Sequence, residues 1–142
     1  MGNDKEEGVG MKKIKLFTDL RKYLDDLEEL LPATEEKFLM DKKAQYGIPM
    51  LMLNIINSCI DLAQELIAIK NLGYPGSYRE TFQTLEKNKL ISKDVCPKMQ
   101  DLVGLRNLLA HEYGEINFEI LYEQAQDLSA VEQFKKKMIG YF

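Results

Sequence analysis

Apolar residues recur along most of the chain at the three- and four-residue spacing that is typical of amphipathic helices. The first such stripe starts after Lys12 and ends at Pro32, because proline cannot continue a helix. Its members are Ile14, Phe17, Leu20, Leu24, Leu27 and Leu31. A longer helical segment covers about 41–71, and Pro49 within it implies either a kink or a helix start. Its apolar positions are Met52, Ile55, Ile56, Cys59, Ile60, Ala63, Leu66 and Ile67.

Residues suited to helix N-caps mark where further helices begin. They are Thr34, Ser77, Ser92 and Asn117. Ser77 with Glu80 has the spacing of a capping box and predicts a helix through about Lys87. The helix capped by Ser92 is expected to run to about Tyr113, where Gly114 fits its exit. We expect one last helix after Asn117, with an inner face made of Ile120, Leu121, Ala125, Leu128, Val131, Phe134 and Met138.

No stretch shows the period-two alternation of a half-buried strand. Four long helices with short connections predict an all-α fold, an antiparallel four-helix-type bundle with extra short helices. The length of 142 residues suggests one domain. Residues 1–10 are polar, contain three glycines and lack an apolar period, so we expect a disordered tail or a cloning remnant. Residues 11–142 are then the helical domain.

Composition narrows the possible functions. A net charge of −4 argues against a broad nucleic-acid-binding face but allows a small, locally basic site. One histidine and two scattered cysteines do not form a standard zinc site, so neither a metal nor a cofactor is expected. Polar residues interrupt the richest apolar stretch, 48–69, which favours a core helix over a membrane span. A reducing cytoplasm is the expected location.

The most informative segment is 106–113, Arg-Asn-Leu-Leu-Ala-His-Glu-Tyr, which contains the only histidine, His111. On a helical wheel Asn107 and His111 are neighbours one turn apart, and this polar set borders the apolar stripe. A histidine near a helix end is often only a cap, a surface residue or a hydrogen-bonded buried group. Arg106 could equally form a structural ion pair with Asp101, and Tyr113 could simply bury its ring.

An arginine and a histidine together are chemically sufficient for work on a phosphodiester. The arginine supplies a fixed cation for the phosphate, and the histidine moves a proton near neutral pH. A helix C-terminus favours the protonated imidazole, which supports proton donation. Such chemistry needs a second histidine, which would have to come from another copy of the chain.

The pattern Arg106-Asn107-x-x-x-His111-x-Tyr113 resembles the R-x4-H-x-Y signature of the HEPN superfamily, and more narrowly its branch of HepT ribonuclease toxins. Two earlier segments resemble the family in the same order, Ile-Ile-Asn-Ser-Cys-Ile-Asp-Leu-Ala from residue 55 and Pro-Gly-Ser-Tyr-Arg-Glu from residue 75. The resemblance covers about residues 11–142. The extended order is far more specific than the bare arginine–histidine spacing.

This resemblance implies a two-fold homodimer in which both arginine–histidine motifs face one cleft. It implies a metal-independent endoribonuclease toxin with an RNA substrate and no cofactor. Arg106 and His111 would be catalytic, and Asn107 would support His111 or the phosphate. The family's partner is a minimal nucleotidyltransferase (MNT) antitoxin, which attaches AMP to the tyrosine of the motif, here Tyr113, and silences the enzyme.

Two other functions stay open from the sequence. Some HEPN proteins resemble non-catalytic nucleotide-binding or partner-docking modules for nucleotidyltransferases, and a purely structural helical dimer ranks last. Three nearby side chains also have open roles. The Asp61 carboxylate could contact Arg106 across the bundle or be a solvated helix acid, and Tyr78 and Arg79 could shape the cleft or pack a loop.

Overall fold

The computed structural model describes residues 4–111 and 115–142, and every regular element within these two ranges is an α-helix. Four helices are long enough to form a bundle, and three shorter ones connect or flank them. In chain order they are α1 (Asp4–Leu30), α2 (Glu35–Leu39), α3 (Lys42–Lys70), α4 (Tyr78–Lys87), α5 (Val95–His111), α6 (Phe118–Gln126) and α7 (Ser129–Tyr141). The predicted all-α class is confirmed.

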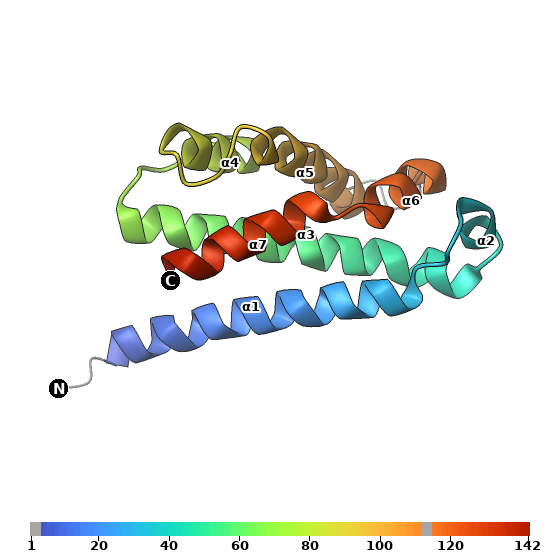
Figure 1. Ribbon diagram of the computed structural model, residues 1–142, viewed down its shortest axis with the longest axis horizontal. Coiled ribbons are helices and arrows are strands. Elements are labelled where there is room, and N and C mark those ends of the chain that lie inside the picture. The colour runs from blue at the N-terminus through green and yellow to red at the C-terminus, as the bar shows by residue number, and fades with distance from the viewer. Residues whose placement is uncertain (1–3, 112–114) are drawn as a thin grey trace.

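Helix α3 is the centre of the bundle and packs against each of the other described helices. Figure 1 shows α1 along one side of α3 and the α4–α5 pair along the opposite side, with α7 running beside α3. The long helices alternate in direction, as the predicted antiparallel bundle requires. Although α3 is long and apolar enough to span a membrane, its buried face fills the bundle, as expected of a core helix.

The start of α3 resolves the alternatives that Pro49 left open. Asp41 caps the helix by accepting a hydrogen bond from the Ala44 amide at 3.1 Å, so α3 begins about two turns before Pro49 and continues through it. Gly47 lies where α3 meets the end of α1, and a Cβ there would come within 2.5 Å of Leu30 Cδ2. A larger residue at this position would have to displace the Leu30 side chain.

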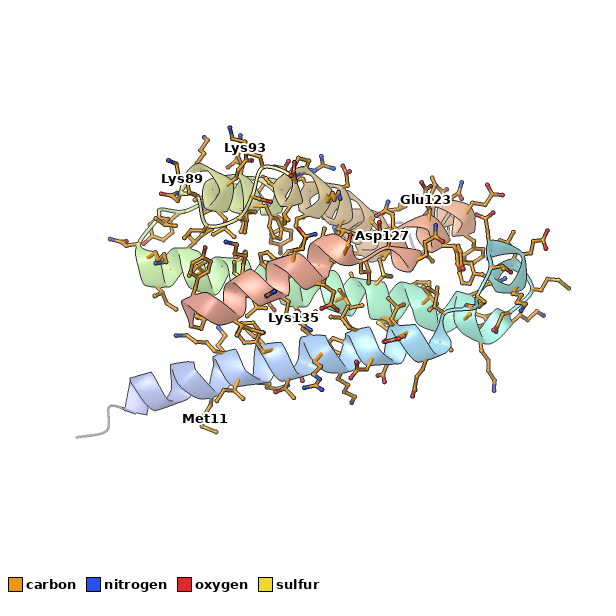
Figure 2. The ribbon with its side chains drawn as sticks, viewed as in Figure 1. Met11, Lys89, Lys93, Glu123, Asp127 and Lys135 are labelled. Carbon is orange, nitrogen blue, oxygen red and sulfur yellow. The ribbon has the colours of Figure 1, made fainter. Side chains whose placement is uncertain are left out.

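The N-terminal end of α1 differs from the sequence-based expectation. The helix begins at Asp4, so it includes residues that carry no apolar period; charged residues with good helix propensity extend it there. Met11 is 72% exposed and points away from the bundle (Figure 2), and Ile14, expected on the inner stripe, is 68% exposed. Helix α1 packs chiefly against α3, so only one of its faces is covered. The domain boundary at residue 11 stays a prediction.

The expectation of one last helix after Asn117 is wrong. Asp127 has extended backbone angles, and its Oδ1 accepts a hydrogen bond from the Ser129 amide at 3.1 Å, which ends α6 and starts α7. Figure 2 shows Asp127 at this junction. Short acidic side chains compete with the helix in this way by binding nearby backbone amides. Ile120, expected on the inner face, is 48% exposed, whereas Leu121, Ala125, Val131, Phe134 and Met138 are buried as predicted.

Candidate functional site

A pocket of about 460 Å³ opens where the C-terminal half of α5 meets the first turn of α4 and the second half of α3. The structure brings three of the predicted site residues together there, because Arg106, Asn107 and His111 all line it. The other lining residues are Gln64, Pro75, Gly76, Ser77, Tyr78, Arg79, Thr81 and Val103. The arginine and the histidine thus face one open space.

Three contacts hold the guanidinium of Arg106 in place. Its Nε donates to Asn57 Oδ1 of α3 at 3.0 Å, and its Nη1 donates to Asn107 Oδ1 at 3.2 Å. Its Cζ lies 5.0 Å from the centre of the Tyr78 ring, which is a cation–π contact. These partners are neutral, so they orient the guanidinium without neutralising it. No other described side chain bonds to its remaining donors, which suit an anion.

The sequence-based alternative of an ion pair to Asp101 is not what the structure shows. Within the described residues, Arg106 has no acidic side chain within 4.0 Å. Asp61 does not serve as its partner either; that side chain interacts electrostatically with Lys12 and Glu65 on the α1 side of α3. Burial raises the pKa of the Asp61 carboxyl, and Lys12 opposes the increase.

The predicted capping box at the start of α4 is confirmed. Ser77 Oγ accepts from the Glu80 amide at 3.1 Å, and Glu80 Oε2 accepts from the Gly76 amide at 2.8 Å. This pair of bonds fixes the first turn of α4, which carries Tyr78 and Arg79. Local sequence chemistry therefore positions the ring that lies against Arg106.

Arg79 lies across the surface of α5 beside the pocket. The Gln100 side chain donates to the Arg79 carbonyl at 3.0 Å, which ties the two helices together. A Cβ on Gly104 would stand only 2.8 Å from Arg79 Nη2, so the guanidinium lies directly over the bare backbone of α5. Arg79 therefore shapes the cleft, which was one of its two expected roles.

The pocket is locally basic in an acidic protein. None of the described residues that line it is Asp or Glu, although the Glu80 carboxylate accepts a hydrogen bond from the amide of the lining residue Gly76. Arg79 and Arg106 both contribute guanidinium groups. The chain as a whole carries a net charge of −4. This arrangement matches the small, locally basic site that the composition allowed.

His111 is the last described residue of α5 and is exposed, as is Asn107. Its position at a helix C-terminus agrees with the sequence-based prediction. The predicted modification site Tyr113 and the predicted helix exit Gly114 lie outside the described residues. Asn107 is bonded to Arg106, so its amide orients the guanidinium.

Sequence reasoning missed the contributions of Asn57 and Gln64. They lie seven residues apart on α3, and therefore on one face two turns apart, within the apolar stretch that polar residues interrupt. Asn57 bonds to Arg106 and Gln64 lines the pocket. The available signal was their helical spacing, because polar residues repeated on one face of a core helix indicate something polar opposite.

An oriented arginine and an exposed histidine in one pocket define a site that can bind a phosphate and move a proton. The bundle around it is of the HEPN type. The family model of HepT-like ribonucleases matches residues 20–138, and the chain belongs to that family. The sequence-based recognition of a HepT-like ribonuclease is confirmed.

Two curated relatives are nucleases. The chain is 32% identical to the mRNA nuclease HepT of Shewanella oneidensis over 99 residues, which is 69% of this chain and 74% of that protein. It is 25% identical to the tRNA nuclease HepT of Aphanizomenon flos-aquae over 96 residues, which is 68% of this chain and 65% of that protein.

Solved structures of toxin–antitoxin complexes share the fold. One, crystallised with AMP-PNP, superimposes with a TM-score of 0.82 at 25% identity, covering 89% of this chain and 96% of that one. A tri-AMPylated Shewanella oneidensis HEPN toxin bound to an MNT antitoxin gives a TM-score of 0.81 at 25% identity, with the same coverage. A cytosolic Bacillus subtilis protein of unknown function shares the fold alone, with a TM-score of 0.71 at 18% identity over 87% of this chain and 88% of that one.

Proposed function

We propose that the protein is a metal-independent endoribonuclease toxin whose active site is completed by dimerisation. The observation that carries this proposal is the presence of Arg106 and His111 in one pocket, where none of the described lining residues is acidic. The nuclease names of the two curated relatives support it. We place its action in the cytoplasm, where RNA and the proposed antitoxin meet.

The proposed reaction is an internal transesterification followed by product release. A base takes the proton of the RNA 2′-hydroxyl, and the 2′-oxygen attacks phosphorus. The bond from phosphorus to the 5′-oxygen breaks, and an acid protonates that oxygen. The products are a 2′,3′-cyclic phosphate and a 5′-hydroxyl. Arg106 stabilises the charge that grows on the phosphate through planar, charge-assisted hydrogen bonds.

The base and the acid cannot both come from one chain, because it contains a single histidine. In a two-fold dimer, His111 of one protomer is the base and the partner's His111 is the acid. His111 is exposed at the end of α5, and exposure is a requirement for contributing to a shared cleft. Asn57, Asn107 and Tyr78 hold Arg106 and leave the histidine free to exchange a proton.

The decisive experiment is cleavage of RNA by the purified protein in EDTA. The expected products carry cyclic-phosphate ends, and the variants His111→Ala and Arg106→Ala are inert although they remain folded. A requirement for divalent metal, or activity that survives His111→Ala, contradicts the proposal. Stable binding to a nucleotidyltransferase without any cleavage identifies the protein as the alternative, a non-catalytic docking module.

We further propose that an MNT nucleotidyltransferase encoded with this chain silences it by attaching AMP to Tyr113. The AMPylated HEPN toxin bound to an MNT antitoxin supports this pairing, as does the position of Tyr113 two residues after His111. AMP adds bulk and negative charge where an RNA phosphate must enter, so it opposes binding. Mass spectrometry after co-expression should find AMP on Tyr113, and Tyr113→Phe should remain unmodified by the antitoxin.

A further inference from the structure

We propose that Arg79 forms a second phosphate-binding subsite, which holds the RNA phosphate next to the one that is cleaved. This inference rests on the proposed ribonuclease function and adds a substrate contact to it. Arg79 and Arg106 line the same pocket, and Arg79 is exposed. Two guanidinium groups at one pocket suit two successive phosphates of a single strand.

The guanidinium of Arg79 is not used by the fold. In the ranges 4–111 and 115–142 it makes no ion pair within 4.0 Å, and it is the backbone carbonyl of this residue, not its guanidinium, that accepts a hydrogen bond from Gln100. Arg106, by contrast, has its neutral partners Asn57 and Asn107. The charge of Arg79 therefore remains available to a ligand.

Gly104 leaves room for this guanidinium. A glycine inside a helix costs about 1 kcal/mol relative to alanine. Here a Cβ would meet Arg79 Nη2 at 2.8 Å, so an alanine would push the guanidinium away from its present place against α5. Gln100, Gly104, Asn107 and His111 follow one another at helical spacing on the face of α5 that meets α4.

The distance between Gly104 and His111 along α5 places the two proposed phosphate sites apart. Gly104 and His111 are seven residues apart, which is roughly 10 Å along the axis at the usual helical rise. The phosphate under attack must lie within reach of His111, whereas the Arg79 guanidinium lies over Gly104. Arg79 therefore suits a neighbouring phosphate of the same strand.

The charge pattern reverses beyond Arg79. The adjoining groove between α5 and α6 also includes Arg79, but Asp101, Glu123 and Asp127 line it. Figure 2 shows Glu123 and Asp127 on this side of the molecule. Lys98 is the other cation that lines this groove. Arg79 thus lies at the edge of the basic region, so we expect the protein to contact only a few phosphates of the RNA strand.

The test measures binding of a fluorescent single-stranded 2′-O-methyl RNA of about twelve nucleotides, comparable to known single-strand site sizes. This probe lacks the attacking hydroxyl, so wild-type protein binds it without cleaving it. The slope of log affinity against log salt falls by about 0.7 for each lost phosphate contact on a single strand. Arg79→Gln should reduce the slope by about that amount and weaken binding roughly tenfold at moderate salt.

Gly104→Ala is a second, independent variant. It displaces the Arg79 guanidinium without removing its charge, and the alanine favours the helix. We expect weaker RNA binding together with unchanged or higher thermal stability. If Arg79 had a purely structural role, weaker binding would be accompanied by lower thermal stability. Gly140→Ala in α7 is the matched control, because a Cβ there meets no atom within 4 Å. Its binding should equal that of the wild type.

The outcomes separate this inference from the proposed function. An unchanged salt slope in Arg79→Gln overturns the second subsite, whatever the activity of the protein. If Arg79→Gln changes the oligomeric state but not the salt slope of RNA binding, the second subsite is also overturned. Arg79 then belongs to the interface between two chains. A reduced slope in a protein that binds the probe but never cleaves unmodified RNA leaves the subsite standing and refutes the nuclease.

Discussion

Arg106 makes only one hydrogen bond to a described side chain of another helix, and its partner is Asn57 of α3. Asn57 Oδ1 accepts from its Nε at 3.0 Å, and hydrogen bonds to charged groups contribute roughly 1.5–3 kcal/mol. Without that acceptor the guanidinium still stacks on Tyr78, but its rotation relative to the Tyr78 ring is no longer fixed. Asn57 is therefore a positioning residue for the proposed chemistry, and its effect on the rate is exerted through Arg106.

Asn57→Ala should lower kcat/KM about tenfold, and most of the loss should lie in kcat, because an oriented donor matters most in the transition state. Unfolding in urea should change little, since a half-exposed Arg106 can bond to water instead. Asn54→Ala, on the same helix, is the control. A loss in kcat/KM as large for Asn54→Ala as for Asn57→Ala would mean that α3, and not the Arg106 contact, is responsible.

Asp61 predicts a pH dependence of stability. Burial raises the pKa of its carboxyl above the ordinary value of 3.8, although Lys12 opposes the increase. The folded state therefore binds this proton more tightly than the unfolded state. The resulting stabilisation is fully present below pH 3.8 and is lost as the pH rises through the raised pKa.

Asp61→Asn should accordingly stabilise the fold at neutral pH, by less than about 1 kcal/mol because the side chain keeps contact with solvent. The gain should vanish in acid, where the wild-type carboxyl is itself protonated. Urea unfolding of both proteins at several pH values measures the gain in stability at neutral pH and its loss in acid. Asp101→Asn, an exposed acid on α5, serves as the control, and an Asp61→Asn gain that persists in acid would contradict the explanation.

At the scale of elements, the first turn of α4 links a sequence motif to the site. The capping box fixes the turn that carries Tyr78 and Arg79. Ser77→Ala should cost about 1 kcal/mol of stability. It should also lower RNA cleavage severalfold, because a frayed first turn releases the ring that lies against Arg106. Chemical denaturation and kcat/KM are the two measurements.

Thr34→Ala is the matched control for that variant. Thr34 caps α2 through the same kind of bond, accepted from the Lys37 amide at 3.2 Å, and it does not line the pocket. It should lose similar stability and keep full activity. Equal losses of activity in the two variants would show that global stability, and not the α4 turn, governs cleavage.

Elements were predictable where local chemistry decides the structure. The helical period and the N-cap residues predicted nearly every helix. The arginine–histidine–tyrosine spacing predicted that Arg106, Asn107 and His111 belong to the site. The break at Asp127 was missed because apolar spacing continues across it, whereas one side-chain bond to the Ser129 amide interrupts the backbone. Contacts between helices, such as Asn57 to Arg106, depend on packing that a one-dimensional pattern does not contain.

At the scale of the whole molecule, charge is distributed unevenly. The protein is acidic overall, yet the described residues that line the pocket beside α4 and α5 are basic or neutral. An RNA is therefore repelled by most of the surface at long range and attracted at one place, and the repulsion weakens as salt screens it. This pattern favours a substrate bound at one cleft over a coat along the strand.

The proposed pairing of chains predicts how activity responds to mixing. If each active site needs both histidines, a dimer with one His111→Ala protomer is inactive. Wild-type and His111→Ala chains, mixed in equal amounts and allowed to exchange, leave about a quarter of the dimers with two intact histidines. Cleavage should then fall to about a quarter of the value for pure wild type at the same total concentration. If each chain works alone, cleavage falls to about half instead. As a control, wild type mixed with Lys136→Ala chains should cleave RNA as fast as pure wild type.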